Sequence, residues 1–132
     1  MIEIPRAIIN ELIGHARIGF PLEVCGILGG SDGAVSRLYR MTNTDASREH
    51  FTMEPKEQFE VARDLRARSL TMLAIYHSHP QAPACPSEED IRLAVAPDVS
   101  YVIVSLTEPD NPEVRSFRIA GGKVEQEELA IT

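Results

Sequence analysis

The sequence predicts an α+β fold in which a mixed β-sheet is flanked by helices. Segments with apolar residues at helical spacing alternate with short, strongly apolar segments of the kind that form buried strands. The chain then ends in two strand-like segments around a glycine pair, which is typical of a hairpin. This order favours one core between a sheet and its helices. The length of 132 residues suits a single domain, 1–132, and no repeat or linker divides it.

The first half of the chain contains one clear helix and two clear strands. Pro5 suits the first position of a helix, and apolar residues follow it at helical spacing as far as Ile18. A Gly-Phe-Pro tripeptide then ends the helix. In order, we expect a helix over 5–18, a buried strand over 24–28, a second strand over 34–41, a polar loop over 42–49 and a short strand over 50–53.

The second half begins with another helix, which Pro55 opens. The apolar stripe of this helix is assigned to four residues, Phe59, Ala62, Leu65 and Leu70. After it we expect a central strand over 71–78, a loop over 80–86, a short helix over about 87–95, a strand over 101–106, a turn over 109–112 and a terminal hairpin of 114–119 and 123–130.

Charge and composition exclude several classes of protein. The formal net charge is −7, so the chain has no general attraction for phosphate backbones and we expect no nucleic-acid partner. The first 20 residues lack the pattern of a signal peptide, and no segment is long enough for a membrane span. We therefore expect a cytoplasmic protein with no membrane partner. Arg63, Arg66 and Arg68 form either a solvated basic face or a docking patch for an acidic partner.

The most informative segment runs from His77 to Asp90. Because side chains alternate along a strand, His77 and His79 at the end of the central strand point to the same side. Pro80 stops the strand, and Asp90 arrives from the first turn of the next helix. Two imidazoles and one carboxylate are the ligand set of a catalytic zinc ion that keeps a fourth position for water. The spacing predicts a hydrolytic metal centre.

Each part of this pattern also has a purely structural interpretation. Ser87 followed three residues later by Asp90 is a pattern that starts a helix, in which Ser87 caps the first turn. Capping and catalysis are compatible, because Ser87 can cap through a lone pair while its hydroxyl faces the metal. We expect His15 and His50 to be ordinary surface or helix-packing residues, and Ser78 to serve packing at the strand end.

The two cysteines, Cys25 and Cys85, are expected to be free thiols in a reducing compartment. Cys25 lies on an apparent strand and suits a small buried residue. Cys85 lies in the loop between the expected metal ligands. It could contact the metal site, become oxidised or only fill space.

At these residues the chain resembles the JAMM, or MPN-plus (JAB domain), metalloproteases. The family pattern is an upstream glutamate, then His-x-His-Pro, six residues, Ser, two residues and Asp. The second part matches without a gap from His77 to Asp90. Residues 21–29 resemble the glutamate-bearing segment of the family, which makes Glu23 the matching acid. The resemblance implies a fold similar to that of cytidine deaminases.

The resemblance also implies a mechanism and a substrate class. One Zn²⁺ ion is held by His77, His79 and Asp90, with Glu23 as general base and Ser87 as donor to the oxyanion. The reaction is hydrolysis of a peptide or isopeptide bond, commonly at the C-terminal tail of a ubiquitin-like protein. The compact chain resembles the stand-alone bacterial members, whose partners are ubiquitin-like sulfur carrier proteins with Gly-Gly tails, in sulfur transfer and cysteine biosynthesis.

Four other functions remain open on the sequence alone. A zinc hydrolase of a small amide would use the same site, whereas a non-catalytic module of the family would lack the ligands that are present here. A RadC-like protein shares the His-x-His-Pro segment, but the acidic charge disfavours a role on DNA. A thiol hydrolase would use Cys25 or Cys85 with a histidine. The sequence identifies neither the scissile bond nor the oligomeric state.

Overall fold

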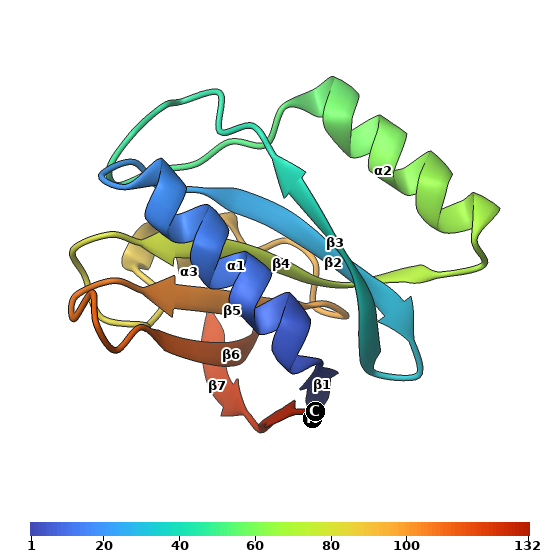
Figure 1. Cartoon of the computed structure of the whole chain (residues 1–132). Helices are drawn as coiled ribbons and strands as arrows, with labels where there is room; N and C mark the ends of the chain where they lie inside the picture. The colour runs from blue at the N-terminus through green and yellow to red at the C-terminus, as the bar shows by residue number, and fades with distance from the viewer.

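A computed structural model describes all 132 residues and contains one mixed sheet of eight strands with three helices. The predicted α+β class is confirmed. The sheet order is β7-β6-β5-β4-β2-β3-β1-β8. In chain order the elements are β1 (Ile2–Ile4), α1 (Arg6–Gly19), β2 (Cys25–Ser31), β3 (Ala34–Met41), α2 (Pro55–Ala67), β4 (Thr71–His79), α3 (Glu88–Leu93), β5 (Ser100–Ser105), β6 (Glu113–Ala120), β7 (Lys123–Glu127) and β8 (Leu129–Ile131) (Figure 1).

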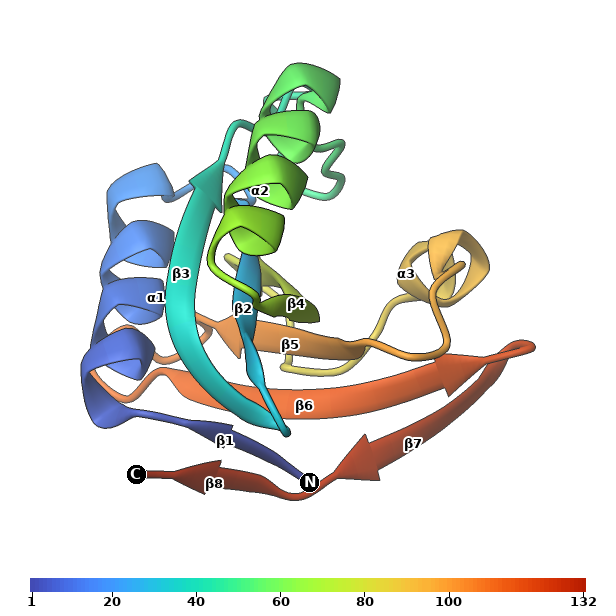
Figure 2. The same cartoon turned by 90° about the vertical axis from the view of Figure 1, so that its right-hand side faces the viewer.

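The three helices are divided between the two faces of the sheet. Helix α1 covers one face, whereas α2 and α3 lie on the opposite face (Figure 2). The α1 face holds the largest apolar cluster, in which Ile9 and Leu12 pack with Leu28, Tyr76 and Val104 of the sheet. The other face holds two smaller clusters, one under α2 and one beneath the chain that leads into and out of α3.

Strand β4 lies near the middle of the sheet. It pairs in antiparallel fashion with β2 and in parallel with β5, so its backbone is held from both sides. Tyr76 is fully buried on the α1 face, where its hydroxyl lies 2.7 Å from Nδ1 of His15. Gly26 leaves the space that the tyrosine ring occupies, because a Cβ at this position would lie 2.1 Å from the ring. The neighbouring His77 therefore projects to the opposite face.

The sheet is strongly curled, and the first and last strands of the chain, β1 and β8, pair with each other at one of its edges. Only Glu128 separates β7 from β8, yet β7 pairs with β6 at one edge and β8 pairs with β1 at the other. The carbonyl of Glu128 accepts a hydrogen bond of 3.1 Å from the backbone N–H of Ile2. The prediction of a single strand over 123–130 is therefore wrong, because this segment pairs with β6 before residue 128 and with β1 after it.

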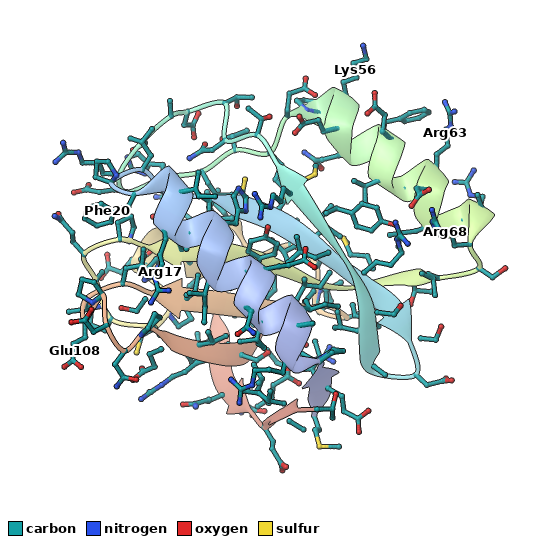
Figure 3. The ribbon with its side chains drawn as sticks, in the orientation of Figure 1. Arg17, Phe20, Lys56, Arg63, Arg68 and Glu108 are labelled. Carbon is teal, nitrogen blue, oxygen red and sulfur yellow. The ribbon has the colours of Figure 1, made fainter.

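Helix α2 buries a narrower stripe than the sequence suggests. Val61 and Leu65, one turn apart, are buried, whereas the predicted stripe residue Phe59 is 68 % exposed. Ala62 is also exposed, and Leu70 lies beyond the end of the helix. The apolar contact of the helix with the sheet is one i, i+4 row, and Phe59, which lies outside that row, faces solvent. Lys56 and Arg63 project outward from α2 (Figure 3), which fits both a solvated basic face and a docking patch.

Three short segments differ from the sequence-based expectations. Strand β1 was not predicted, because three residues carry no periodic signal and this strand depends on pairing with β3 and β8. The expected strand over 50–53 is only an isolated bridge between Asn43 and Met53. Helix α3 covers Glu88–Leu93 and is shorter than expected, with Ala94 already extended. None of the helices is long and apolar enough to cross a membrane.

Candidate metal centre

The end of β4 brings two imidazole rings together. His77 and His79 project to the same side of the strand and are 2 % and 5 % exposed. Their Nε2 atoms lie 3.2 Å apart. The Nδ1 atom of His79 is 2.8 Å from the carbonyl oxygen of Pro83, so this ring can donate through Nδ1, and Nε2 offers a lone pair once it has released its proton. Both rings thus direct a nitrogen to one point, as the alternation of side chains predicts.

Asp90 completes the group from the first turn of α3. Its Oδ2 atom lies 3.1 Å from Nε2 of His77 and 3.1 Å from Nε2 of His79. The same atom accepts a hydrogen bond of 2.9 Å from the Ser87 N–H, and Ser87 Oγ accepts one of 3.0 Å from the Asp90 N–H. This reciprocal pair is a capping box. The structural and the functional interpretations of Ser87 and Asp90 therefore coexist, because the cap aims Asp90 at the histidines.

The group formed by His77, His79 and Asp90 fits a zinc ion. Its three polar atoms are 3.1 to 3.2 Å apart, which is close to the ~3.3 Å that separates ligands of a tetrahedral zinc ion with bonds of about 2.0–2.1 Å. Two nitrogens and one carboxylate oxygen also match the ligand preference of zinc. Cys85 is an exposed free thiol outside this group, and Cys25 is buried and free.

The ionisation of His77 and Asp90 favours cation binding, whereas His79 must release a proton when a cation binds. Burial lowers the pKa of His77, which keeps this ring neutral with lone pairs available. Burial opposes ionisation of Asp90, but hydrogen bonds from His77 and His79 hold the pKa of this carboxyl well below its usual range. For His79, burial is outweighed by the hydrogen bonds to Asp90 and Pro83, which raise its pKa. The result is a buried carboxylate beside two imidazoles.

Glu23 lies in the segment between α1 and β2 and is 5 % exposed. Its backbone is held on both sides, since its N–H donates to Ser47 O at 2.8 Å and its carbonyl accepts from Asn43 Nδ2 at 3.0 Å. The next residue is fastened to β4, where Ser78 Oγ accepts a hydrogen bond from the Val24 N–H at 2.9 Å. Ser78 thus serves strand-end packing, as expected, and fixes the segment that carries Glu23.

The Glu23 carboxyl group is prepared to exchange a proton. Its Oε1 atom is buried and has no hydrogen-bond partner in the protein. Burial raises its pKa to about 8, opposed by the positive charge of a protonated His79 and reinforced by the charge of Asp90. A carboxyl group with a pKa near neutrality beside a metal site suits a general base. A cation bound at His79 and Asp90 would lower this pKa and favour the carboxylate.

Glu23, His79 and Ser87 line one pocket of about 790 Å³ that is open to solvent. The loop before α2 and the first turn of α3 form its remaining walls. On the other side of the ligands, His77 and Asp90 border a smaller groove of about 230 Å³ with mainly apolar walls. The structure therefore brings all five residues predicted for the site to one place, between the end of β4, the start of α3 and the segment before β2.

Sequence reasoning missed residues that support this site from the loop before α2. Asn43 Nδ2 donates to the carbonyls of both Glu23 and His50, at 3.0 and 2.9 Å. His50, expected to be an ordinary surface residue, lies 2.7 Å from Glu89 and lines the pocket. No local pattern marks either residue, because their partners are up to 39 positions away in the sequence.

Comparison with known proteins agrees with this geometry. Residues 5–120 match the family described as prokaryotic homologs of the JAB domain. The chain is 36 % identical over 126 residues to the CysO-cysteine peptidase of Mycobacterium tuberculosis, covering 94 % of this chain and 86 % of that protein. It is 33 % identical over 92 residues to a probable TtuB-protein conjugate cleaving protease of Thermus thermophilus, covering 69 % and 62 %.

The fold is also found in a solved structure with substantial sequence identity. The solution structure of a Desulfitobacterium hafniense protein superposes with a TM-score of 0.92 at 44 % identity, covering 100 % of this chain and 93 % of the other. The family match extends from the first turn of α1 to the end of β6 and includes every residue of the candidate metal centre. The chain is therefore a member of the prokaryotic JAB-domain (JAMM) family.

Proposed function

We propose that this protein is a zinc-dependent peptidase that hydrolyses an amide bond at the C-terminal tail of a ubiquitin-like sulfur carrier protein. The convergence of His77, His79 and Asp90 beside the buried Glu23 is the observation that carries this proposal. The similar Mycobacterium and Thermus proteins are named for cleavage of CysO-cysteine and of TtuB-protein conjugates, which supports a carrier-linked substrate. Two free cysteines fit a reducing compartment such as the cytoplasm.

In this mechanism His77, His79 and Asp90 hold one zinc ion. When bound, zinc acts as a Lewis acid that lowers the pKa of a water molecule and polarises the scissile carbonyl. Glu23 would accept a proton from the attacking water through its buried carboxylate and pass that proton to the leaving amine. Ser87 uses its hydroxyl proton to stabilise the negative charge that develops on the carbonyl oxygen.

The hydrogen bonds of the site allow these roles. Ser87 Oγ accepts from the Asp90 N–H through a lone pair, which leaves its own proton available. Asp90 is held by the Ser87 N–H, so its carboxylate stays directed at the two rings. A Gly-Gly tail suits the approach to such a site, because a chain without side chains can come close to the metal without steric conflict.

The decisive experiment compares the wild type with Glu23→Gln on a carrier protein whose Gly-Gly terminus is joined by an amide bond to a single amino acid. We expect both proteins to bind zinc with similar stoichiometry and only the wild type to release the amino acid, as measured by mass spectrometry. Glu49→Gln, at an exposed acid that lines the same pocket, is the matched control and should retain turnover. Normal turnover by Glu23→Gln would refute the assignment of the base.

A second arm of the experiment distinguishes metal from thiol chemistry. Chelation should abolish turnover and added zinc should restore it, whereas alkylation of the exposed Cys85 should leave turnover unchanged. Burial raises the pKa of the Cys25 thiol to about 12, so this group stays protonated and unreactive at neutral pH. Loss of turnover on alkylation alone would favour a thiol hydrolase over the zinc peptidase.

A further inference from the structure

Phe51 lies directly against one of the two histidines of the metal centre. Its ring stacks on the ring of His77, with the centroids 4.7 Å apart and the planes 25° from parallel. Phe51 is partly buried and packs with the apolar cluster beneath α2. It also borders the groove that His77 and Asp90 line. The contact is therefore part of a packed wall rather than a chance approach of two exposed side chains.

The two histidines differ in what orients their rings. A ligand histidine usually donates its second ring N–H to a carboxylate, a carbonyl or a water, which fixes the ring plane and the tautomer. His79 follows this rule through the carbonyl of Pro83 at 2.8 Å. His77 does not, because its Nδ1 atom is buried without a hydrogen-bond partner in the protein. Apart from the contacts of Nε2 with His79 and Asp90, the plane of the His77 ring depends on packing, and the Phe51 ring stacks on one of its faces.

The loop that carries Phe51 is fastened on both sides of this residue. Asn43 donates to the carbonyl of His50 at 2.9 Å, and its Oδ1 atom accepts from the Thr52 N–H at 3.1 Å. The same asparagine donates to the carbonyl of Glu23 at 3.0 Å. His50 in turn lies 2.7 Å from Glu89 of α3. These hydrogen bonds therefore fix the position of Phe51 relative to Glu23 and to α3, the helix that carries Asp90.

We propose that Phe51 is a positioning residue that fixes the plane of the His77 ring for zinc binding, and that Asn43 holds Phe51 in place. This inference rests on the proposed function, since it assigns a role within the same metal centre. The torsion that rotates an imidazole about its Cβ–Cγ bond has broad minima. Without the stacked ring, His77 samples orientations in which Nε2 is turned away from Nε2 of His79 and Oδ2 of Asp90. The metal-free site then becomes less preorganised, and zinc binds more weakly.

The test measures zinc affinity directly by competition with a chromophoric chelator. Phe51→Leu removes the aromatic face but keeps apolar volume, and we expect it to weaken zinc binding roughly tenfold, as for other residues that orient metal ligands. Phe51→Tyr keeps the ring and should retain wild-type affinity. Phe59→Leu, at a phenylalanine on α2 that is 68 % exposed, is the matched control and should also retain it.

A second readout follows the ring itself in metal-free protein. Long-range ¹H–¹⁵N NMR spectra report the tautomer and the environment of each histidine ring nitrogen. In Phe51→Leu we expect the His77 signals to broaden or shift while those of His15, on the opposite face of the sheet, stay in place. Far-UV circular dichroism establishes that each variant is folded. If Phe51→Leu does not fold, Asn43→Asp, which keeps the acceptor of Asn43 but removes its two donors, should show the same weakened zinc binding in a folded protein.

Several outcomes would overturn the inference. Wild-type zinc affinity and unchanged His77 signals in Phe51→Leu would show that the stack does not position the ring. Wild-type zinc affinity with a raised KM would make Phe51 a substrate contact instead. Failure of the wild-type chain to bind zinc at all would refute the proposed function itself, so that result is distinct from a loss confined to the Phe51 and Asn43 variants.

Discussion

At the scale of single residues, Ser87 caps α3 through its hydroxyl group, and the proposed mechanism gives the same hydroxyl a second role. The lone pair of Oγ caps α3 by accepting from the Asp90 N–H, and the remaining proton is available to an oxyanion. Each role predicts a different consequence of substitution, because the cap contributes to folding whereas the proton contributes to the transition state. Comparing substitutions that differ in capping ability therefore separates the two contributions.

Ser87→Ala and Ser87→Gly should both lower kcat, by about 10²–10³-fold, because both remove the hydroxyl proton. They should differ in stability. Alanine is a poor N-cap and should lower the free energy of unfolding by about 1 kcal/mol, whereas glycine should lower it by only a few tenths of a kcal/mol. Urea denaturation and steady-state kinetics on the same samples test both statements. Retention of kcat in Ser87→Gly would mean that the hydroxyl proton takes no part in the reaction.

Glu23 makes the stability of the metal-free protein depend on pH. Burial raises its pKa in the folded state from 4.5 to about 8, so the folded protein binds more protons than the unfolded chain between these values. The contribution of Glu23 to stability is fully present below pH 4.5 and is lost as pH rises toward 8. Glu23→Gln removes this loss. In the presence of chelator, we expect the variant to become progressively more stable than the wild type from pH 5 to pH 8 in urea titrations. Parallel curves would show that Glu23 ionises normally in the folded state.

The convergence of His77, His79 and Asp90 could be predicted from the sequence because their geometry is local. Residues two positions apart on a strand point to the same face. A serine three residues before Asp90 marks the start of a helix, and the capping box at that start orients the carboxylate of Asp90. Phe51 and Asn43 could not be predicted. Their contacts with His77 and Glu23 join segments 26 and 20 positions apart, and no periodic pattern encodes such a contact.

At the scale of secondary structure, the side chains of β4 alternate between the apolar core under α1 and the candidate metal centre on the opposite face of the sheet. Tyr76 packs under α1, and its neighbour His77 faces the metal centre, so substitutions at these two positions should have different effects. Burial lowers the pKa of His15 to about 4, with Arg40 adding to the effect, so this ring is neutral at pH 7 and its bond to the Tyr76 hydroxyl joins two uncharged groups.

Tyr76→Phe tests this separation of faces. The substitution removes the hydroxyl that lies 2.7 Å from His15 Nδ1 and leaves a partly buried nitrogen unpaired, so it should lower the free energy of unfolding by about 1–2 kcal/mol. Zinc affinity should not change, because Tyr76 and His77 project to opposite faces. Denaturation with and without the His15→Phe substitution in the same background checks the assignment. Equal costs of Tyr76→Phe in both backgrounds would mean that the hydrogen bond contributes nothing.

Sequence patterns predict the long elements of this fold better than the short ones. Helix α1 and the buried strands carry strong periodic or continuous apolar signals, and the structure confirms them. Strands β1 and β8 have three residues each, and their stability comes from pairing with each other across the chain ends. The stripe of α2 was predicted correctly only at Leu65. Phe59 and Ala62 lie outside the row of Val61 and Leu65 that faces the sheet, and Leu70 lies beyond the end of the helix. Tertiary contacts, and not local sequence preference, determine the conformation and burial of these segments.

At the scale of the whole molecule, the metal centre joins parts of the chain with very different degrees of burial. The end of β4 belongs to the interior, whereas α3 has six residues, none of them buried. Ile91 packs α3 against an apolar cluster of the sheet, and Asp90 adds the contacts with the two histidines of β4. Three segments that are distant in sequence, those of Glu23, His77 and Asp90, converge where this attachment forms. Zinc bound there stabilises the folded state, because the unfolded chain does not hold the three ligands together.

Zinc binding should therefore raise the global stability of the protein. Free zinc at 100 times its Kd should raise the free energy of unfolding by about 2.7 kcal/mol, and chelator should reverse the effect. Asp90→Ala should remove the zinc-dependent shift, whereas Asp98→Ala, at an exposed acid after α3, should keep it. Thermal and urea unfolding measure the shift within each protein, so the weaker cap of Asp90→Ala does not obscure it. Hydrogen exchange should slow most in α3, since that helix has no buried side chains of its own. An equal zinc-dependent shift in Asp90→Ala would place the stabilising ion elsewhere on the molecule and remove the physical basis for the catalytic assignment.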